Sequence, residues 1–323
     1  MKEFELIRHF FSEQVIKRKD VVLGIGDDCA IVSPAERQNI AITTDTLVAG
    51  VHFPHETSAR AIGHKSIAVN LSDLAAMGAE PTWLSLAITM PQVNLKWIEE
   101  FCLGVFELCE YYNVQLIGGD TTQGPLSITV TAQGLIPVNK HLTRSGAKAG
   151  DWIYVTGEVG DAALALKHIL HEVNIAPEYR ESVQRSLDFP TPRILAGQAL
   201  RGYASAAIDL SDGIISDLGH LCTASQVGAN IILEHLPISQ ALRATVGTEK
   251  AFEMALTGGD DYELLFTVSE DNKVGIETAL ANSSNTITCI GQINRSEKIT
   301  TTLNRKSVAV KTESFEHFSS TKE

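Results

Sequence analysis

Aspartate closely follows an apolar run, with only small residues between, at several separate places in this chain of 323 residues. Asp and Gly favour turns on their own, so one such segment means little by itself. Six of them, ending apolar runs or embedded in small apolar stretches, indicate an α/β (α+β) chain with acidic turns at strand ends. The segments are GIGDDC (24–29), TTDT (43–46), NLSD (70–73), IGGDTT (117–122), DLSDG (209–213) and GGDDYE (258–263).

The apolar pattern between these segments predicts the secondary structure. We expect strands at 39–47 and 126–136, helices at 61–80 (ending near Gly78) and 95–114, and in VQLIGGD a short strand that runs into a turn. Strand, turn and helix are expected again at 151–170 and 204–224, and helix, turn and strand at 251–268. The length suggests two domains. The Gly-, Pro- and charge-rich segment 137–151 predicts their boundary, giving domains of residues 1–137 and 138–323.

Composition excludes several classes of protein. The net charge of −13 disfavours nucleic acid as a partner, because phosphate backbones attract clustered Lys and Arg. Five cysteines without a CxxC pair argue against a disulfide framework or structural zinc. We find no apolar run of membrane-spanning length, and MKEFELIRHFF lacks the apolar core of a secretory signal. We therefore expect a cytoplasmic protein that does not enter membranes.

The acidic segments predict a site for hard cations. Carboxylate and hydroxyl oxygens are the ligands that Mg²⁺ prefers, and His and Cys are not grouped as transition-metal ligands. Asp73 lies in a helix of small apolar residues, where an unpaired carboxylate would be costly and a metal ion would offset the cost. The chain lacks a GxxxxGK[ST] loop, so phosphoryl transfer here would rely on clustered Asp and Mg²⁺ for positioning and charge neutralisation.

Seven motifs together resemble the thiamine-monophosphate kinase family, within the superfamily of aminoimidazole-ribonucleotide synthetase and selenophosphate synthetase. They run in order from residue 23 to residue 268 and are LGIGDDCA, AITTDTLVAGVHF, AVNLSDLAAMGAEP, QLIGGDTTQGPLSITV, LTRSGAKAGDWIYVTG, AIDLSDGIISDLGH and TGGDDYELLFTV. The resemblance implies Mg²⁺-dependent, direct transfer of the ATP γ-phosphate to thiamine monophosphate. It also implies the two-domain aminoimidazole-ribonucleotide synthetase-like fold. In that fold an N-terminal domain binds ATP and Mg²⁺ and pairs in a homodimer, and a C-terminal α/β domain follows.

The resemblance also assigns individual residues. The metal ligands are Asp28, Thr43, Thr44, Asp45, Asp73, Asp120, Asp209 and Asp212. The ATP contacts are Gly119, Asp120, Arg144 and Ser211, with Tyr112 beside the nucleotide. Asp120, Asp212 and Arg144 are expected to carry the catalysis, and His52 to contact the substrate.

The chain departs from the family pattern in two places, both at expected substrate contacts. Asp260 stands where the family usually has Glu, so the carboxylate is one methylene shorter. The family's aromatic residue near the C-terminus corresponds to Thr312, and Phe315 is a candidate replacement.

Several alternatives remain open. A related ATP-dependent synthetase could phosphorylate a carbonyl oxygen instead, and a catalytically silent nucleotide-binding dimer would keep the fold without the reaction. Asp27 is expected to bond backbone or support the ligands, and Asp217 to be a solvated or capping acid. The segment TGEVGDAAL (156–164) either binds an anion at a helix N-terminus or simply connects strand to helix.

Overall fold

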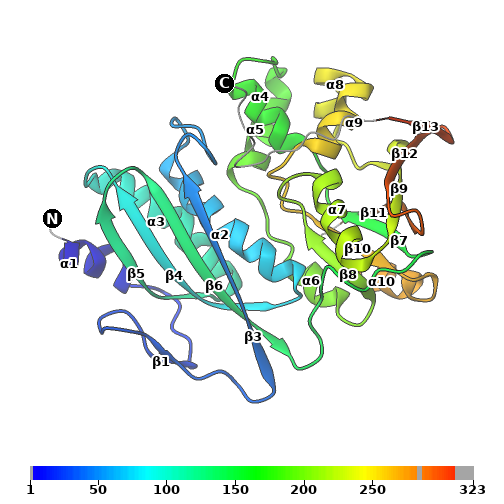
Figure 1. Cartoon of the computed structure of the whole chain (residues 1–323). Helices are drawn as coiled ribbons and strands as arrows, with labels where there is room; N and C mark the ends of the chain where they lie inside the picture. The colour runs from blue at the N-terminus through cyan, green and yellow to red at the C-terminus, as the bar shows by residue number, and fades with distance from the viewer. Residues whose placement is uncertain (1–2, 282–285, 310–323) are drawn as a thin grey trace, which may run out of the picture. The chain divides into compact units, whose positions relative to one another are not determined.

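The computed structural model describes residues 3–281 and 286–309, and these fall into two compact units, Met1–His141 and Leu142–Glu323. Figure 1 traces the chain through both units. None of the helices in the described part of the chain is long and apolar enough to cross a membrane.

The first unit is built on a four-stranded sheet in the order β3-β6-β4-β5. β6 runs antiparallel to both β3 and β4, and β5 lies parallel to β4 at the edge. Its elements are α1 Glu3–Leu6, η1 Ile7–Ser12, β1 Val21–Leu23, β2 Ile31–Val32, β3 Gln38–Val48, α2 Ala59–Ala76, β4 Glu80–Met90, α3 Leu95–Tyr112, β5 Gln115–Gln123 and β6 Ser127–Pro137.

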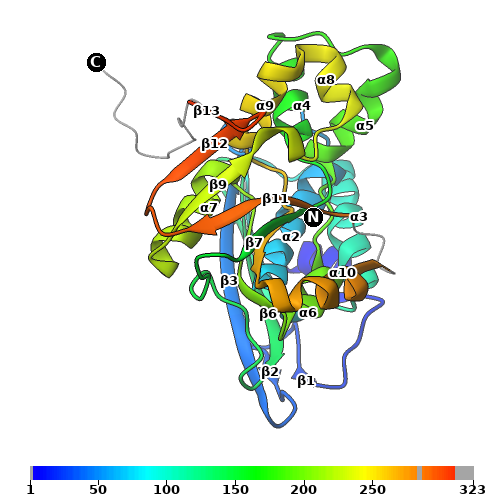
Figure 2. The same cartoon turned by 90° about the vertical axis from the view of Figure 1, so that its right-hand side faces the viewer.

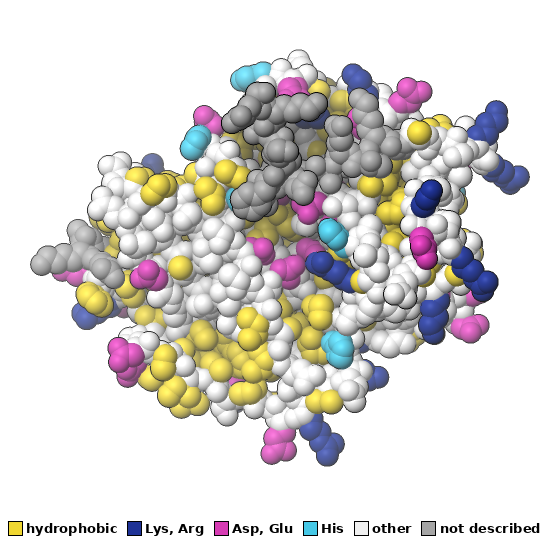
Figure 3. Space-filling model, viewed as in Figure 1, with side chains coloured by type: hydrophobic (Ala, Val, Ile, Leu, Met, Phe, Trp, Pro, Cys, Tyr) yellow, Lys and Arg dark blue, Asp and Glu magenta, His cyan; other side chains and the backbone are white. Residues whose placement is uncertain are grey.

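Strand β3, predicted at 39–47, has two unlike faces. Odd-numbered residues from Ala41 to Leu47 are half-buried or buried, and even-numbered residues from Ile42 to Thr46 are exposed, as the strand period of two requires. Helix α2 packs against this sheet. On the exposed side, Ile40 and Ile42 are 44% and 66% accessible. Figure 3 shows hydrophobic side chains gathered on the surface of the first unit that faces the viewer.

Helices α2 and α3 form where the apolar spacing predicts them. The Ser58 hydroxyl caps α2 by accepting a hydrogen bond from the Ala61 N–H at 3.2 Å, and α2 ends just before Gly78, which takes a φ of +67°. Asn94 and left-handed Asn113 cap the two ends of α3. The predicted helices at 61–80 and 95–114 are thus confirmed, including the end near Gly78.

The second unit is built on a seven-stranded sheet in the order β13-β12-β9-β11-β7-β10-β8, and Figure 2 shows its β12–β9–β11 part. Neighbouring strands are antiparallel except for β12 and β9. Its elements are β7 Trp152–Thr156, α4 Asp161–Ile169, α5 Pro177–Asp188, α6 Ile194–Leu200, β8 Ala204–Asp209, α7 Ile214–Ser225, β9 Gly228–Ile232, η2 Leu233–His235, α8 Gln240–Val246, α9 Thr248–Thr257, β10 Leu264–Val268, η3 Glu270–Asn272, α10 Lys273–Ala281, β11 Ile287–Asn294, β12 Ile299–Leu303 and β13 Lys306–Val308.

Three connecting segments meet at one edge of this second sheet. β7 and β8 both end where the antiparallel β10 begins, since Leu264 pairs with Asp209 and Leu265 pairs with Val155. The segments 157–160, 210–213 and 258–263 therefore lie next to one another. This register brings three of the sequence motifs to a single edge although they are far apart along the chain.

Candidate active site

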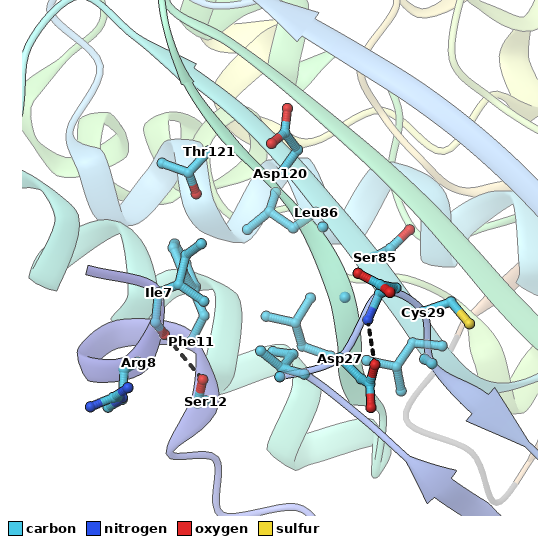
Figure 4. A pocket seen from close by; sticks show the side chains of 18 of the residues that line it. Ile7, Arg8, Phe11, Ser12, Asp27, Cys29, Ser85, Leu86, Asp120 and Thr121 are labelled. Atoms are coloured by element: carbon cyan, nitrogen blue, oxygen red, sulfur yellow. Dashed lines mark hydrogen bonds between the residues drawn. The ribbon is translucent and has the colours of Figure 1, made fainter. Parts of the chain in front are cut away.

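A cavity of about 920 Å³ lies in the first unit, and Figure 4 shows its lining. Three parts of the chain form its walls: the N-terminal helical segment, residues 25–30, and the paired strands β4 and β5. The predicted metal ligands Asp28 and Asp120 and the predicted ATP contact Gly119 all line this cavity. Asp27 also lines it, and one of its carboxylate oxygens accepts a hydrogen bond from the Asp28 N–H at 2.9 Å, which is the backbone contact expected of this residue.

Asp120 does not lie in a turn, and the prediction that VQLIGGD runs from a strand into a turn was wrong. β5 continues through both glycines to Gln123, and Asp120 pairs with Ala87 of β4. Gly119 marks a close approach of the two strands, because a Cβ there would lie 1.9 Å from the Leu86 carbonyl oxygen. Asp120 is consequently held on a rigid edge strand with its side chain exposed.

Two carboxylates lie close together between β3 and α2. Burial raises the pKa of Asp45 to about 6, and the nearby Asp73 carboxylate adds to the rise. The Thr43 hydroxyl donates a hydrogen bond to Asp73, which is half-buried. Asp73 is therefore not the unpaired carboxylate that the sequence suggested, although the pair keeps an unfavourable concentration of negative charge.

Thr44 points the other way. Its side chain lies on the opposite face of β3 from Thr43 and Asp45, where its hydroxyl hydrogen-bonds to Thr131 at 2.9 Å. The structure thus separates the Thr44 side chain from the ligand set predicted with it. Only the backbone of Thr44 remains next to that set.

Asp45 and Asp73 could hold Mg²⁺ together with oxygen ligands from outside the chain. Across residues 3–281 and 286–309, no three His, Cys, Asp or Glu side chains form a complete metal site. Mg²⁺ is commonly held by one or two carboxylates, with water and substrate phosphate supplying the other oxygens. The close Asp45–Asp73 pair and its Thr43 hydroxyl fit that pattern.

His52 and Tyr112 belong to the first unit but do not line the cavity. His52 follows β3, and its Nδ1 accepts a hydrogen bond from the Val48 N–H at 3.0 Å. Tyr112 ends α3, with its ring edge-on to that of Tyr111 at 4.7 Å between centroids. The structure therefore does not bring either residue to Gly119 and Asp120 within this cavity.

In the second unit, Asp217 holds the segment that follows β8. The sequence predicted that this residue is either a solvated or a capping acid. Asp217 is buried in the first turn of α7, and its Oδ2 accepts hydrogen bonds from the N–H groups of Ser211 and Asp212, both at 3.1 Å. Burial raises the pKa of Asp217 to about 7, against the opposing effect of these hydrogen bonds. Asp217 is a capping acid, and it positions the segment that carries Ser211 and Asp212, beside buried Asp209.

The segment 258–263 packs directly on this loop. The Asp260 N–H donates to the Ser211 carbonyl oxygen at 2.9 Å, and the Tyr262 hydroxyl donates to the Asp260 carboxylate at 2.9 Å. Asp260 adopts a φ of +70°, a conformation that Asp tolerates better than most residues. The predicted nucleotide contact Ser211 and the predicted substrate contact Asp260 are thus brought together.

Half-buried Arg193 and buried Glu263 form an ion pair that sequence reasoning missed. Arg193 Nε lies 2.6 Å from Glu263 Oε2, a second guanidinium nitrogen contacts Oε1, and the Thr156 hydroxyl donates to Oε2 at 2.5 Å. Burial raises the pKa of Glu263, and Arg193 opposes that rise. The partners are 70 residues apart in sequence, and no local pattern pointed to their pairing.

The N-terminus of α4 is capped by the chain itself. The Gly160 N–H donates to both carboxylate oxygens of Asp261, at 2.9 and 3.0 Å. An external anion at 156–164 would have to displace this half-buried carboxylate. The segment therefore fits the alternative of a simple strand-to-helix connection.

Asp261 gives a stability prediction. Burial raises its pKa well above the usual range, with Glu263, Asp161 and Asp260 adding to the rise and Gly160 opposing it. A carboxyl whose pKa is higher in the folded state stabilises the fold at low pH and loses that contribution as pH rises. Asparagine has no charge to bury. As the pH is raised from 5 to 8, we therefore expect the free energy of unfolding of Asp261→Asn to rise relative to that of the natural protein, as measured by urea unfolding. A stability difference that does not change with pH would contradict this expectation.

Arg144 lies in the segment before β7. Its side chain is exposed, and its carbonyl oxygen accepts a hydrogen bond from the Ser225 hydroxyl at 3.0 Å. The N–H of Ala207 in β8 bonds to the neighbouring Thr143 carbonyl at 2.9 Å, which ties this segment to the second sheet. Thr312 and Phe315 lie outside the described residues.

Comparisons with known proteins show to which family the chain belongs. Residues 26–136 match the family described as AIR synthase related protein, N-terminal domain, and residues 148–304 match the corresponding C-terminal domain. Thiamine-monophosphate kinase of Escherichia coli K12 is 52% identical over 90% of each chain. The crystal structure of thiamine-monophosphate kinase from Stenotrophomonas maltophilia superposes with a TM-score of 0.85 at 43% identity, covering 90% of this chain and 93% of that one.

A solved complex adds ligands to the comparison. AaThiL in complex with AMPPCP and TMP superposes with a TM-score of 0.77 at 32% identity, covering 91% of this chain and 92% of that one. Because both family domains match in order and the identity extends over nine-tenths of the chain, this protein belongs to the thiamine-monophosphate kinase family.

Proposed function

We propose that this chain phosphorylates thiamine monophosphate to thiamine diphosphate with ATP and Mg²⁺ in the cytoplasm. An oxygen of the substrate phosphate attacks the γ-phosphorus, the bond from that phosphorus to the β–γ bridging oxygen breaks, and ADP leaves. The observation that carries the proposal is the 52% identity with thiamine-monophosphate kinase over 90% of the chain. The AaThiL complex with AMPPCP and TMP supports this choice of substrates.

The acidic residues have a defined part in this proposal. Mg²⁺, when bound, neutralises phosphate oxygens and so lowers the repulsion between two anionic substrates. The first unit offers Asp28, Thr43, Asp45, Asp73, Asp120 and the Thr44 backbone as ligands, and the second unit offers Asp209 and Asp212. Gly119, Asp120, Arg144 and Ser211 contact ATP, Tyr112 flanks it, and His52, Asp260 and a residue near Thr312 or Phe315 contact the substrate. Arg144 has an exposed guanidinium, which suits it to grip phosphate oxygens.

The proposal is tested by incubating the chain with ATP and thiamine monophosphate, with and without Mg²⁺, and separating the products by chromatography. Free thiamine serves as the parallel substrate. We expect thiamine diphosphate only from the monophosphate and only with metal, and reversible loss of activity in EDTA. ATP binding without this product would favour a carbonyl-phosphorylating synthetase or a silent nucleotide-binding dimer.

Asp260 should tolerate lengthening. We expect Asp260→Glu to keep or lower the KM for thiamine monophosphate, because the family usually carries the longer carboxylate and the charge is unchanged. Steady-state kinetics at saturating ATP measure this value. A large rise in KM would show that the segment around the +70° backbone of Asp260 is shaped for the shorter side chain.

We further propose that the exposed face of the first sheet pairs with a second copy of the chain. Ile40 and Ile42 are exposed there beside a ladder of threonines, in which Thr46 and Thr129 hydrogen-bond at 2.9 Å. Exposed apolar patches mark protein–protein interfaces, and a symmetric dimer pairs the same patch of both copies.

Ile42→Lys should weaken that pairing, because it places a charge in the apolar patch. We expect light scattering to show a dimer for the natural chain and a shift toward monomer for this variant. Val274→Lys is the matched control, since Val274 is 72% exposed on α10 of the second unit. If the mass of Ile42→Lys in solution equals that of the natural chain, the interface does not lie on this face of the sheet.

A further inference from the structure

Tyr262 is a buried aromatic residue with an unusual backbone conformation, two positions after Asp260. Its φ is +50° and that of Asp260 is +70°, so both residues lie in the left-handed region. Asp adopts this region readily, whereas a bulky aromatic residue does so at a cost in free energy. Tyr262 is only 8% exposed, and its hydroxyl donates a hydrogen bond to the Asp260 carboxylate at 2.9 Å. The strained conformation therefore coincides with a direct contact between the two side chains.

We infer that Tyr262 is a positioning residue, whose hydroxyl directs the Asp260 carboxylate toward thiamine monophosphate. The inference rests on the proposed function for the contact between Asp260 and the substrate. Asp260 has one methylene fewer than the Glu that the family usually carries, so its carboxylate has a shorter reach and depends more on its direction. None of the roles assigned from the sequence motifs includes Tyr262.

The backbone around Tyr262 is fixed by bonds that do not use its hydroxyl. The Asp260 N–H donates to the Ser211 carbonyl oxygen at 2.9 Å. The Tyr262 N–H donates to the Leu210 carbonyl oxygen at 2.8 Å, and the Leu210 N–H donates to the Glu263 carbonyl oxygen at 2.8 Å. The buried Glu263 side chain is held in turn by its ion pair. Removal of the Tyr262 hydroxyl should therefore leave the main chain in place and take away only one hydrogen bond of the Asp260 carboxylate.

Charge decides which part of the substrate this carboxylate can contact. Thiamine monophosphate has an anionic phosphate at one end, and a cationic thiazolium ring joined to an amino-bearing pyrimidine ring at the other. A carboxylate repels the phosphate and attracts the cationic part. The direction of the Asp260 carboxylate should therefore affect the affinity for the substrate more than the rate at which the phosphate is transferred.

Tyr262→Phe tests the positioning role, and Tyr154→Phe is the matched control. Phenylalanine removes the hydroxyl and keeps the buried ring. Tyr154 is also buried in the second unit, and its hydroxyl donates to the Glu277 carboxylate at 2.8 Å, but Glu277 has no proposed contact with either substrate. Calorimetry in the presence of Mg²⁺ measures the dissociation constant of thiamine monophosphate. Steady-state kinetics measure kcat, and urea unfolding measures stability.

We expect Tyr262→Phe to weaken the binding of thiamine monophosphate about fivefold, with kcat near that of the natural chain. Tyr154→Phe should change neither quantity, although both variants lose a hydrogen bond from a buried ring and should lose similar stability. Unchanged affinity in Tyr262→Phe, or equal weakening in both variants, would overturn the inference.

A double-mutant cycle separates positioning from a structural role. Asp260→Gly removes the carboxylate and suits the +70° backbone, because glycine adopts positive φ without steric cost. With no carboxylate to direct, adding Tyr262→Phe should cause no further loss of affinity. A second loss of the same size in this background would mean that the hydroxyl acts on the substrate or on the fold directly, and the inference would fall.

The inference and the proposed function fail separately. If the natural chain binds thiamine monophosphate but forms no thiamine diphosphate, and Tyr262→Phe alone weakens that binding, the positioning role stands and the kinase reaction falls. If thiamine diphosphate forms normally and Tyr262→Phe binds the substrate as the natural chain does, the reaction stands and the positioning role falls. A natural chain that neither binds nor converts thiamine monophosphate would overturn both.

Discussion

Asp120→Asn is expected to lower kcat by about 100-fold or more, because a carboxylate proposed to hold Mg²⁺ at the nucleotide phosphates loses its charge. The amide has nearly the same shape, and Asp120 is exposed on an edge strand, so the fold should not depend on it. We therefore expect the free energy of unfolding to change by no more than about 0.5 kcal/mol. Steady-state kinetics at saturating ATP and Mg²⁺, with urea unfolding alongside, measure the two quantities.

Glu80→Gln is the matched control for Asp120→Asn. It removes the same charge from an exposed position on the same sheet, at the start of β4 and outside the cavity. We expect its kcat to stay near that of the natural chain. Near-normal turnover of Asp120→Asn would remove Asp120 from the catalytic residues, and equal losses in both variants would point to net charge instead.

Local patterns predicted the elements of the fold well. The strand at 39–47 and the helices at 61–80 and 95–114 were found because apolar spacing and capping residues such as Ser58 and Asn94 act over a few residues. The motifs also indicated two acidic segments of the second unit, 209–213 and 258–263, and the glycine turn within 156–164. They could not show that these segments meet at one sheet edge, which depends on the register of β10 with β7 and β8.

The errors arose where tertiary structure overrides local preference. Two consecutive glycines favour a turn, but pairing with β4 keeps residues 118–122 in β5. The family resemblance placed Thr44 in the ligand set with Thr43 and Asp45, and the pleat of β3 turns the Thr44 side chain to the opposite face, which a list of motif residues does not show. The Arg193–Glu263 pair and the Asp261 cap of α4 join distant segments, and a single sequence contains no local signal for such contacts.

Gly104→Ala is expected to cause a large loss of stability in the first unit. Helices α2 and α3 cross at two glycines, where a Cβ at Gly104 would lie 2.0 Å from the Arg60 carbonyl oxygen and one at Gly63 would lie 2.1 Å from the Phe101 carbonyl oxygen. Both obstacles are backbone atoms, so no side-chain rotation relieves them. The helices must move apart, and we expect a loss of about 3 kcal/mol in the free energy of unfolding.

Gly219→Ala separates this effect from helix propensity. Gly219 lies within α7. A Cβ added there would have the Ile299 Cδ1 atom as its nearest neighbour, at 3.9 Å, which is an ordinary contact distance. Alanine should therefore stabilise that helix by about 0.5–1 kcal/mol, because it restricts the unfolded chain and favours the helix. If the free energy of unfolding falls for Gly104→Ala and rises for Gly219→Ala, the loss arises at the α2–α3 crossing.

A rise in the free energy of unfolding of Gly104→Ala would mean that the two helices can separate without loss. Because α2 carries Asp73, a real separation should also disturb the Thr43–Asp73 hydrogen bond and weaken Mg²⁺-dependent activity in the molecules that remain folded.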